Sequence, residues 1–436
     1  MKKILYITYY WPPSGGPGVQ RSLKFVKYLY SYGYEPIVIT VNPAKASYPV
    51  IDHSLSAEIS TNTRVIKTNT FEPFRLYEIL TRKKEIPHSG FANEGNPSFV
   101  QKLSRFIRGN LFVPDPRKGW NTFVMRVVDE LMKTESISAV ITSSPPHSTQ
   151  LIGLKIKQKY KLPWVVDLRD PWTDIYYYKS LYHLSFIARL DATYEKRVLQ
   201  NADAVLVVSK AIKRLFAAKL PNAGADHIHV LPNGFDAEDF NKPITTNTNE
   251  FTIAYTGTMA PSYKITSFLK TLKELVANYG QGKIRVKIAG KVSPEITQQI
   301  EDHQLTNCFE FLGYLDHLDA IKLMQESTAL LLVIPDIEHN EGILTGKLFE
   351  YLASGKPIIG LGPVKGDAAE IINQVQAGSM FDYNDENGIS LMLSTLCNQF
   401  HTGRTDHKGF NEKVKQYSRQ ELTRQLAQIL NNIEKA

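Results

Sequence analysis

The sequence has 436 residues, of which 43% are hydrophobic and 22% charged, as is typical of a soluble globular protein. This length is too great for one ordinary core and indicates two domains. No apolar run approaches the roughly 18 residues of a membrane-spanning helix, and the basic start at Met1 leads into an apolar segment too short for a signal peptide, so we expect a cytoplasmic protein. Its two cysteines, Cys308 and Cys397, cannot build a disulfide framework or a zinc site alone, and we expect both to be buried and inert.

The charge is distributed unevenly along the chain. Residues 1–235 hold 32 Lys and Arg against 18 Asp and Glu, a net charge of +14, whereas the remaining residues hold 19 against 25, a net charge of −6. The two values add up to the net charge of +8 of the whole chain. This asymmetry favours a basic half that faces an anionic acceptor or membrane surface, and uneven surface decoration is the alternative.

Short apolar strands alternate with helical stretches along the first half of the chain. A helix is expected at Gln20–Ser31, and strands are expected at Ile4–Thr8, Glu35–Val41, Ala139–Thr142, Trp164–Asp167, Ala204–Val208 and His227–Leu231. Such alternation is typical of a parallel sheet with helices on both faces, in which ligands bind where strands end and helices begin.

Residues 72–120 interrupt this alternation. Within them, apolar residues at helical spacing are interleaved with cations: Phe99, Leu103, Phe106, Ile107 and Leu111 with Lys102, Arg105 and Arg108. An apolar stripe flanked by cations suits a helix that lies in a membrane interface. A helix that faces the core would show much the same pattern, so the sequence leaves both structures open.

A second alternating series begins near Phe251. Strands are expected at Thr252–Thr256, Ile284–Ala289, Phe309–Leu312, Leu330–Ile334 and Pro357–Leu361, and helices at Ile265–Asn278, Ala320–Glu326, Leu348–Ser354, Ala368–Gln374 and Ser418–Ile433. The polar run 236–249 is predicted to be a linker. The sequence therefore predicts an α/β protein with two doubly wound, Rossmann-like domains, residues 1–235 and 236–415, and a C-terminal helix within residues 416–436.

The segment Gly346–Gly360, GKLFEYLASGKPIIG, has the groups needed to hold a nucleoside diphosphate. A helix is expected to start near Lys347, and the N–H groups and dipole of a helix start stabilise an anion. Lys347 adds a positive charge, and Glu350 follows about one turn later, where it is able to accept hydrogen bonds from two ribose hydroxyls. A capped helix with a solvated lysine and glutamate is the alternative.

Four further loops follow predicted strands. Gly257 ends the first strand of the second series, where glycine allows a phosphate to approach the backbone, and Lys264 is the nearest cation. The run SGGPG around Gly16 precedes a helix, but its spacing is not that of a dinucleotide fingerprint, and a plain tight turn also explains it. His147 and Asp170 follow two other strands, on the usual ligand face of such a sheet, although a structural histidine and a loop ion pair between Arg169 and Asp170 fit as well.

Five segments, in this order along the chain, resemble those of retaining glycosyltransferases of family 4, which have the GT-B fold: ILYITYYWPPSGGPGVQRSLKFVKYL, SSPPHST, PWVVDLRDPW, VLPNGFD and GKLFEYLASGKPIIG. The resemblance covers nearly the whole chain and is to bacterial members that build surface polysaccharides. It implies two domains that face a cleft, with the C-terminal helix crossing back to the first. It also implies transfer of a sugar from a nucleotide sugar to a glycan or to an acceptor linked to a lipid diphosphate.

The resemblance also implies roles for individual residues. Donor-binding roles fall to the strand-end residues Gly16, Gly257, Lys264 and Tyr314 and to the later residues Glu341, Gly346, Lys347, Leu348 and Glu350. His147 would touch the donor sugar, and Asp170 would meet the sugar or the acceptor. The family usually pairs Glu350 with a second glutamate at position 342, where this chain has Gly342. Either a bulged loop lets Glu341 reach the sugar, or backbone N–H groups replace it.

The expected chemistry is front-face displacement without a covalent carboxylate intermediate. Because the sequence has no D-x-D motif, we expect no metal and no other cofactor. No nucleic acid is expected as a partner, and the inner face of the cell membrane is an expected location. A GT-B sugar-nucleotide epimerase or phosphorylase and a non-catalytic lipid-binding scaffold are the rival functions, whereas a nicotinamide-dependent dehydrogenase lacks its fingerprint.

Overall fold

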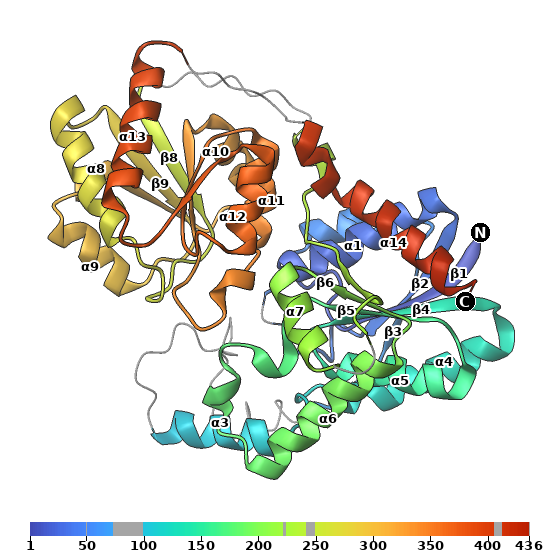
Figure 1. Cartoon of the computed structure of the whole chain (residues 1–436). Helices are drawn as coiled ribbons and strands as arrows, with labels where there is room; N and C mark the ends of the chain where they lie inside the picture. The colour runs from blue at the N-terminus through green and yellow to red at the C-terminus, as the bar shows by residue number, and fades with distance from the viewer. Residues whose placement is uncertain (49, 73–98, 221–223, 241–248, 405–411, 436) are drawn as a thin grey trace. The chain divides into compact units, whose positions relative to one another are not determined.

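The computed structural model describes residues 1–48, 50–72, 99–220, 224–240, 249–404 and 412–435. The chain divides into two compact units, one of Met1–Pro232 with Arg419–Ala436 and one of Asn233–Ser418 (Figure 1). These divisions lie a few residues from the predicted ones, after residues 235 and 415. Of the predicted linker, residues 241–248 lie outside the described residues, and the short 3-10 helix at Ala237–Phe240 belongs to the second unit.

The first unit is a sheet of seven parallel strands covered by helices. The strand order is β3-β2-β1-β4-β5-β6-β7. The strands are β1 (Lys2–Thr8), β2 (Tyr34–Val41), β3 (Arg64–Thr68), β4 (Ile137–Ser144), β5 (Trp164–Leu168), β6 (Ala204–Val207) and β7 (Ile228–Val230). The helices are α1 (Pro17–Leu29), α3 (Phe99–Leu111), α4 (Asn121–Thr134), α5 (Ser148–Tyr160), α6 (Ser185–Asn201), α7 (Lys210–Ala218) and α14 (Arg419–Ile433).

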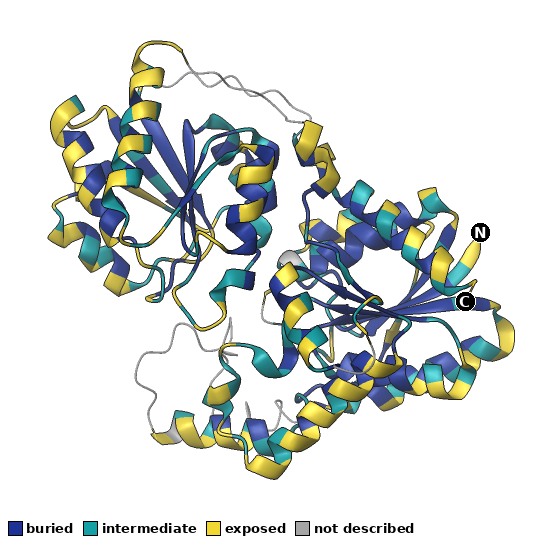
Figure 2. Cartoon of the chain, viewed as in Figure 1, coloured by how far each residue is buried: buried dark blue, intermediate teal, exposed yellow. Residues whose placement is uncertain are grey.

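The central strands of this sheet are apolar on both faces because helices cover both (Figure 2). Along β1, Leu5 and Ile7 face the core under α4 and α5, whereas Ile4 and Tyr6 face the core under α1. Apolar residues of α14 join the second of these cores, beside α1. The C-terminal helix therefore crosses back to the first unit, as predicted.

The second unit is a sheet of six parallel strands in the order β10-β9-β8-β11-β12-β13. The strands are β8 (Phe251–Thr256), β9 (Ile284–Ala289), β10 (Phe309–Gly313), β11 (Ala329–Val333), β12 (Ile358–Leu361) and β13 (Gly378–Phe381). The helices are α8 (Thr266–Tyr279), α9 (Pro294–Asp302), α10 (His317–Glu326), α11 (Gly346–Ser354), α12 (Asp367–Val375) and α13 (Glu386–His401). Both cysteines are buried and unpaired.

In each sheet the chain reverses its direction of winding once, between β1 and β4 in the first unit and between β8 and β11 in the second. In open parallel sheets, ligands bind beyond the carboxyl ends of the strands at such a reversal. The loops after these four strands are therefore where a site is expected in each unit.

The predicted strands are all present, but β3 and β13, each at one edge of its sheet, were not predicted. β3 carries Arg64 and Lys67, which suit an exposed edge but weaken the apolar signal of a strand. β13 has only four residues and begins with Gly378, so it resembles a turn in sequence. No helix in the described part of the chain is long and apolar enough to cross a lipid bilayer.

Candidate functional site

In the second unit, α11 begins at Gly346, after the loop that follows β11. The N-cap residue Thr345 makes no capping hydrogen bond, and its Oγ1 is buried with no hydrogen-bond partner among the described residues. The first N–H groups of a helix have no acceptor within the helix, and with the helix dipole they attract an anion. The start of α11 therefore presents donors at the reversal between β8 and β11.

Lys347 reaches from the first turn of α11 to the end of β8. Its Nζ donates a hydrogen bond to the Tyr255 hydroxyl at 2.7 Å and lies 4.0 Å from the centre of that ring, a cation–π contact. A β-carbon at Gly257 would come within 3.0 Å of this Nζ, and Gly257 has a φ of 106°, which side-chain-bearing residues rarely adopt. The fold thus brings together Gly257 and Lys347, two of the residues predicted to hold a diphosphate.

Burial controls the protonation of Lys347. Desolvation lowers the pKa of its ammonium group to about 7, and the nearby carboxylate of Glu350 opposes this shift. Near neutral pH the lysine is therefore only partly charged when no anion is bound. A diphosphate placed beside Nζ would raise the pKa again, because an opposite charge favours the charged form.

Glu350 lies one turn after Lys347 and is partly buried. Its Oε1 is 3.9 Å from Nδ1 of His317, the first residue of α10. His317 Nε2 is in turn 3.0 Å from Oδ2 of Asp239. Sequence reasoning did not identify His317 or Asp239, because only the fold brings His317 near Glu350 and Asp239 near His317. The role of Glu350 in binding ribose stays a prediction.

The other residues predicted in this unit lie in varied surroundings. Lys264 is exposed and forms an ion pair with Asp336, so part of its charge is already balanced. Glu341 lies on the short 3-10 helix Asn340–Gly342, with Oε1 4.0 Å from His339 Nδ1. The Leu348 side chain is fully buried in the core, so only its backbone is available to a ligand at the start of α11. Tyr314 follows β10, and 79% of its surface is exposed.

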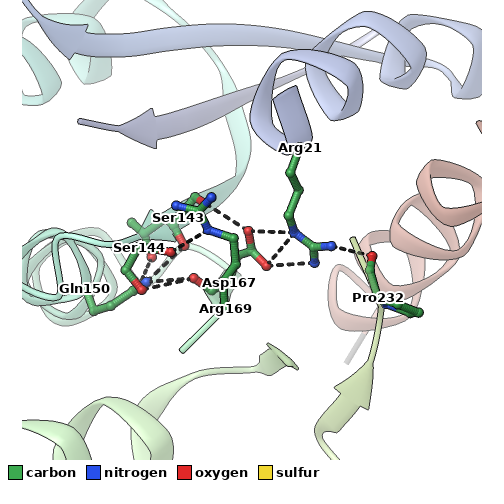
Figure 3. A network of polar contacts seen from close by, with 8 residues as sticks. Arg21, Ser143, Ser144, Gln150, Asp167, Arg169 and Pro232 are labelled. Carbon is green, nitrogen blue, oxygen red and sulfur yellow. Dashed lines mark hydrogen bonds and ion pairs between the residues drawn. The ribbon is translucent and has the colours of Figure 1, made fainter. Parts of the chain in front are cut away.

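In the first unit, the loop after β1 packs against the loop after β5. Gly16 is the N-cap residue of α1 and has a φ of 101°. A β-carbon at Gly18 would lie 1.7 Å from Nη1 of Arg169, so only glycine lets this arginine lie against α1. Arg169 Nε also donates to the carbonyl oxygen of Ser144 at 2.8 Å (Figure 3). Arg169 therefore ties the ends of β1, β4 and β5 together.

A buried ion pair lies beneath these loops. Arg21 on α1 contacts Asp167 on β5 through Nε at 3.2 Å and through Nη2 at 2.9 Å, and both side chains are about 1% exposed (Figure 3). Ser143 donates to the second carboxylate oxygen at 2.8 Å, and Arg21 Nη1 donates to the Pro232 carbonyl at 2.5 Å. Arg21 thus joins α1 and β5 to the residue at which the chain leaves this unit.

His147 precedes α5 at the end of the loop after β4. Its ring stacks on Trp172, with 4.8 Å between centroids and 10° between planes. Burial, and then the charge of Arg169, lower its pKa to about 3, so the ring is neutral near pH 7. Its Nδ1 is buried with no hydrogen-bond partner in the described parts of the chain. A neutral imidazole of this kind is suited to hydrogen-bond a ligand hydroxyl rather than to act as an acid.

Asp170 lies on the loop between β5 and Trp172 and is partly buried. Burial raises the pKa of its carboxyl group, and the neighbouring Arg169 counteracts this. Asp170 and His147 follow strands β5 and β4, which are paired in the sheet. Whether either contacts a substrate stays a prediction.

The two units match two sequence families in chain order. Residues 82–239 match Glycosyltransferase Family 4, and residues 250–399 match Glycosyl transferases group 1. The two matches together cover most of the chain. This chain is a glycosyltransferase of the family 4 type. No curated protein sequence matches the chain.

Solved structures show that this glycosyltransferase has the GT-B fold. HepE of Anabaena in complex with UDP-glucose is 14% identical, with a TM-score of 0.62 over 99% of this chain and 100% of that one. A glycosyltransferase from Rickettsia africae is 15% identical, with a TM-score of 0.64 over 99% and 98%. The lipopolysaccharide outer core galactosyltransferase WaaB is 13% identical, with a TM-score of 0.58 over 99% of each chain.

A second buried acid of this glycosyltransferase, Asp191, holds the tryptophan on which His147 stacks. Asp191 on α6 accepts a hydrogen bond from the Trp172 indole at 3.0 Å and one from the Tyr178 hydroxyl at 2.9 Å. Trp172 is the residue on which His147 stacks.

Within the described residues, no three His, Cys, Asp or Glu side chains are grouped so as to hold a metal ion.

We expect Asp191→Asn to stabilise the protein increasingly as the pH rises. Burial raises the pKa of Asp191 to about 7, so the folded state binds more protons than the unfolded state between about pH 4 and 7. Over that range the parent protein loses stability as the pH rises, by up to about 4 kcal/mol, and the asparagine variant does not. Urea denaturation at pH 5 and pH 8 measures this difference, and equal effects of the substitution at both pH values would contradict it.

Proposed function

We propose that this glycosyltransferase moves a sugar from a nucleotide-sugar donor to a glycan or lipid-linked acceptor in cell-surface polysaccharide biosynthesis, with retention of the anomeric configuration. The observation that supports donor binding most directly is the position of Lys347. Its Nζ lies over Tyr255 beside Gly257, at a helix start that also holds the Thr345 hydroxyl, for which the described residues provide no hydrogen-bond partner. A cation, free N–H groups and a hydroxyl at one point suit a diphosphate.

In the proposed reaction, the nucleoside diphosphate leaves as the acceptor oxygen forms its bond to the anomeric carbon. Lys347 and the first N–H groups of α11 stabilise the negative charge that develops on the leaving phosphate oxygen. Glu350 accepts hydrogen bonds from the ribose hydroxyls, and the backbone at Gly313 and Tyr314 holds the base. The leaving diphosphate accepts the proton of the acceptor hydroxyl, so no protein base is needed.

The first unit is proposed to act on the sugar and the acceptor. His147, which is neutral near pH 7, donates or accepts one hydrogen bond with a sugar hydroxyl. Asp170 binds the sugar or the acceptor. Neither side chain forms a covalent intermediate, and attack and departure occur on the same face of the sugar. Nuclear magnetic resonance of the product during the first turnovers reports its anomeric configuration, and an inverted product would overturn this mechanism.

We further propose that the enzyme needs no metal ion and no other cofactor, and that its transferred sugar is a hexose or a related sugar. The positive charge of Lys347 and the start of α11 supply the stabilisation that a divalent ion gives elsewhere. Activity in excess EDTA tests this proposal directly. Complete loss of activity that Mg²⁺ or Mn²⁺ restores would contradict it.

A thermal-shift screen against nucleotide sugars identifies the donor, because a ligand that binds only the folded state raises the melting temperature. UDP and UDP-glucose are the first candidates, because the HepE structures contain them. At a concentration one hundred times the dissociation constant, binding adds about 2.7 kcal/mol to the free energy of unfolding. No shift with any nucleotide sugar would overturn the proposed function, and full turnover of a donor without acceptor would favour an epimerase.

The affinity for the donor is expected to fall as the pH rises from 6 to 8.5. The diphosphate of a nucleotide sugar does not titrate in this range, whereas Lys347 loses its proton around pH 7. Above that pH, binding has to take up a proton, which costs up to about tenfold in affinity per pH unit. Isothermal titration calorimetry in buffers of different ionisation enthalpy measures both the affinity and the proton uptake. A flat profile would contradict the assignment of Lys347.

We propose that the acceptor is built on a lipid diphosphate and that the enzyme works in the cytoplasm at the inner face of the cell membrane. The excess of basic residues in residues 1–235, a net charge of +14, supports this location. Sedimentation with anionic liposomes at low salt tests it.

A further inference from the structure

Helix α3 is oriented with its apolar side outward. Phe99 is 80% exposed and Leu111 is 72% exposed, and the apolar residues between them on the same stripe, Leu103, Phe106 and Ile107, are exposed as well. Arg105, by contrast, is only 6% exposed and lies on the side that faces the protein. An ordinary surface helix packs its apolar stripe inward. The core-facing alternative left open by the sequence is therefore wrong for this helix.

Polar contacts hold α3 in this orientation. Asn110 Nδ2 donates to the carbonyl oxygen of Tyr182 at 3.1 Å, and the Leu184 N–H donates to Asn110 Oδ1 at 2.7 Å. The Asn110 amide therefore pairs with one carbonyl oxygen and one N–H group of the turn that leads into α6. These hydrogen bonds fix α3 in the orientation that exposes its apolar stripe.

The turn before α6 and the start of α6 extend the same apolar surface. Exposed apolar side chains occur there at Tyr182, Leu184, Phe186 and Leu190. The hydrogen bonds of Asn110 place this turn against α3, and Figure 2 shows exposed residues along both helices. We call the surface made by these residues and the α3 stripe the α3–α6 face. Exposed apolar surfaces built from several large side chains mark interaction sites.

The exposed charges of the two helices all have one sign. On α3 and α6 the exposed charged residues are Lys102, Arg189, Lys196 and Arg197. The acids of these helices, Asp191 and Glu195, are buried and bonded within the protein. A second copy of this chain would bring the same positive charges to the contact. An anionic surface that is apolar beneath fits both the cations and the large apolar side chains.

We propose that the α3–α6 face docks on an anionic membrane surface, with its apolar side chains inserted at the level of the lipid headgroups and its cations against lipid phosphates. This surface lies next to the loop after β5, which carries Asp170 and the tryptophan on which His147 stacks. Tyr178 and Trp172 both donate to Asp191 on α6, and Trp172 stacks on His147. Docking would therefore bring the bilayer close to the loop on which an acceptor linked to a lipid diphosphate would bind. In that respect the inference rests on the proposed function.

The test is cosedimentation of the full chain with vesicles of neutral phosphatidylcholine, with and without about one third phosphatidylglycerol. The parent protein is expected to bind the anionic vesicles at low salt and to lose affinity as the salt concentration rises. The double substitution Leu103→Glu with Leu190→Glu is expected to weaken binding at least tenfold. Leu391→Glu on α13 of the second unit replaces a leucine that is even more exposed, at 72% against 48% for Leu103, and is the control, for which no change is expected.

A second variant separates charge from apolar contact. Arg189→Gln with Lys196→Gln is expected to reduce the preference for anionic over neutral vesicles several-fold. A thermal shift with the donor is expected to be unchanged in every variant, since no substitution lies in the second unit's candidate site. Unchanged donor binding with no vesicle binding by the parent protein would overturn the membrane proposal and leave the donor function standing. Loss of a dimer in the leucine double variant would show that the face binds a second copy and would also overturn it.

Discussion

Replacing Lys347 by methionine is expected to weaken donor binding about 10- to 100-fold, because a charge-assisted hydrogen bond contributes about 1.5–3 kcal/mol. Methionine keeps the apolar stem of the side chain as far as Cε but has no ammonium group to offer a diphosphate. Its Cε takes the position of the lysine Cε, which would lie 3.3 Å from a β-carbon at Gly257, so Gly257 keeps a close neighbour. Isothermal titration calorimetry with UDP and with UDP-glucose measures the loss.

The stability of this variant separates a binding role from a structural one. Burial lowers the pKa of Lys347 to about 7, so below that pH the folded protein has to hold an ammonium group in a poorly hydrated position. Methionine removes this cost, and the melting temperature at pH 6 is not expected to fall. Lys273→Met, an exposed substitution on α8 of the same unit, should leave donor affinity unchanged. Equal affinity in the Lys347 and Lys273 variants would refute the role given to Lys347.

The part of the fold that depends on local sequence was predictable. Each central strand is a short apolar run followed by a helix, and this alternation predicted parallel sheets and the ligand face at the strand ends. Gly257 and Lys347 were predicted as site residues for the same reason, because one ends a strand and the other begins a helix. Their contact follows once the winding of the sheet reverses between β8 and β11.

Features that depend on contacts between distant segments were not predictable. Lys264 looks like a free cation in the sequence, and only the fold places Asp336 beside it. The orientation of α3 depends on the hydrogen bonds of Asn110 to the turn before α6, more than 70 residues away. The apolar stripe alone was therefore compatible with a helix that turns it toward the core and with one that turns it outward. His317 near Glu350 and Asp191 beneath Trp172 have no motif that marks them.

Sequence reasoning also missed Arg21, because nothing in the neighbouring residues indicates that it pairs with Asp167. Of the missed residues, Arg21 is expected to matter most for stability, because this ion pair is buried. Its substitution by methionine is expected to lower the free energy of unfolding of the first unit by about 3–5 kcal/mol, since it leaves a buried carboxylate without its partner. Urea denaturation followed by tryptophan fluorescence isolates this unit, because all four tryptophans of the chain lie in it.

A double-mutant cycle distinguishes the ion pair from packing. Arg21→Met combined with Asp167→Asn removes both charges and keeps the shape of the carboxylate, so the double variant should be more stable than Arg21→Met alone. Ser143 still has an oxygen to which it can donate in that variant. Lys133→Met, which breaks the exposed pair with Glu130 on α4, is the control and is expected to leave the unfolding midpoint unchanged. If Arg21→Met and Lys133→Met behaved alike, the pair would contribute nothing, and another contact would have to hold α1 on β5 at the point where the chain leaves the first unit.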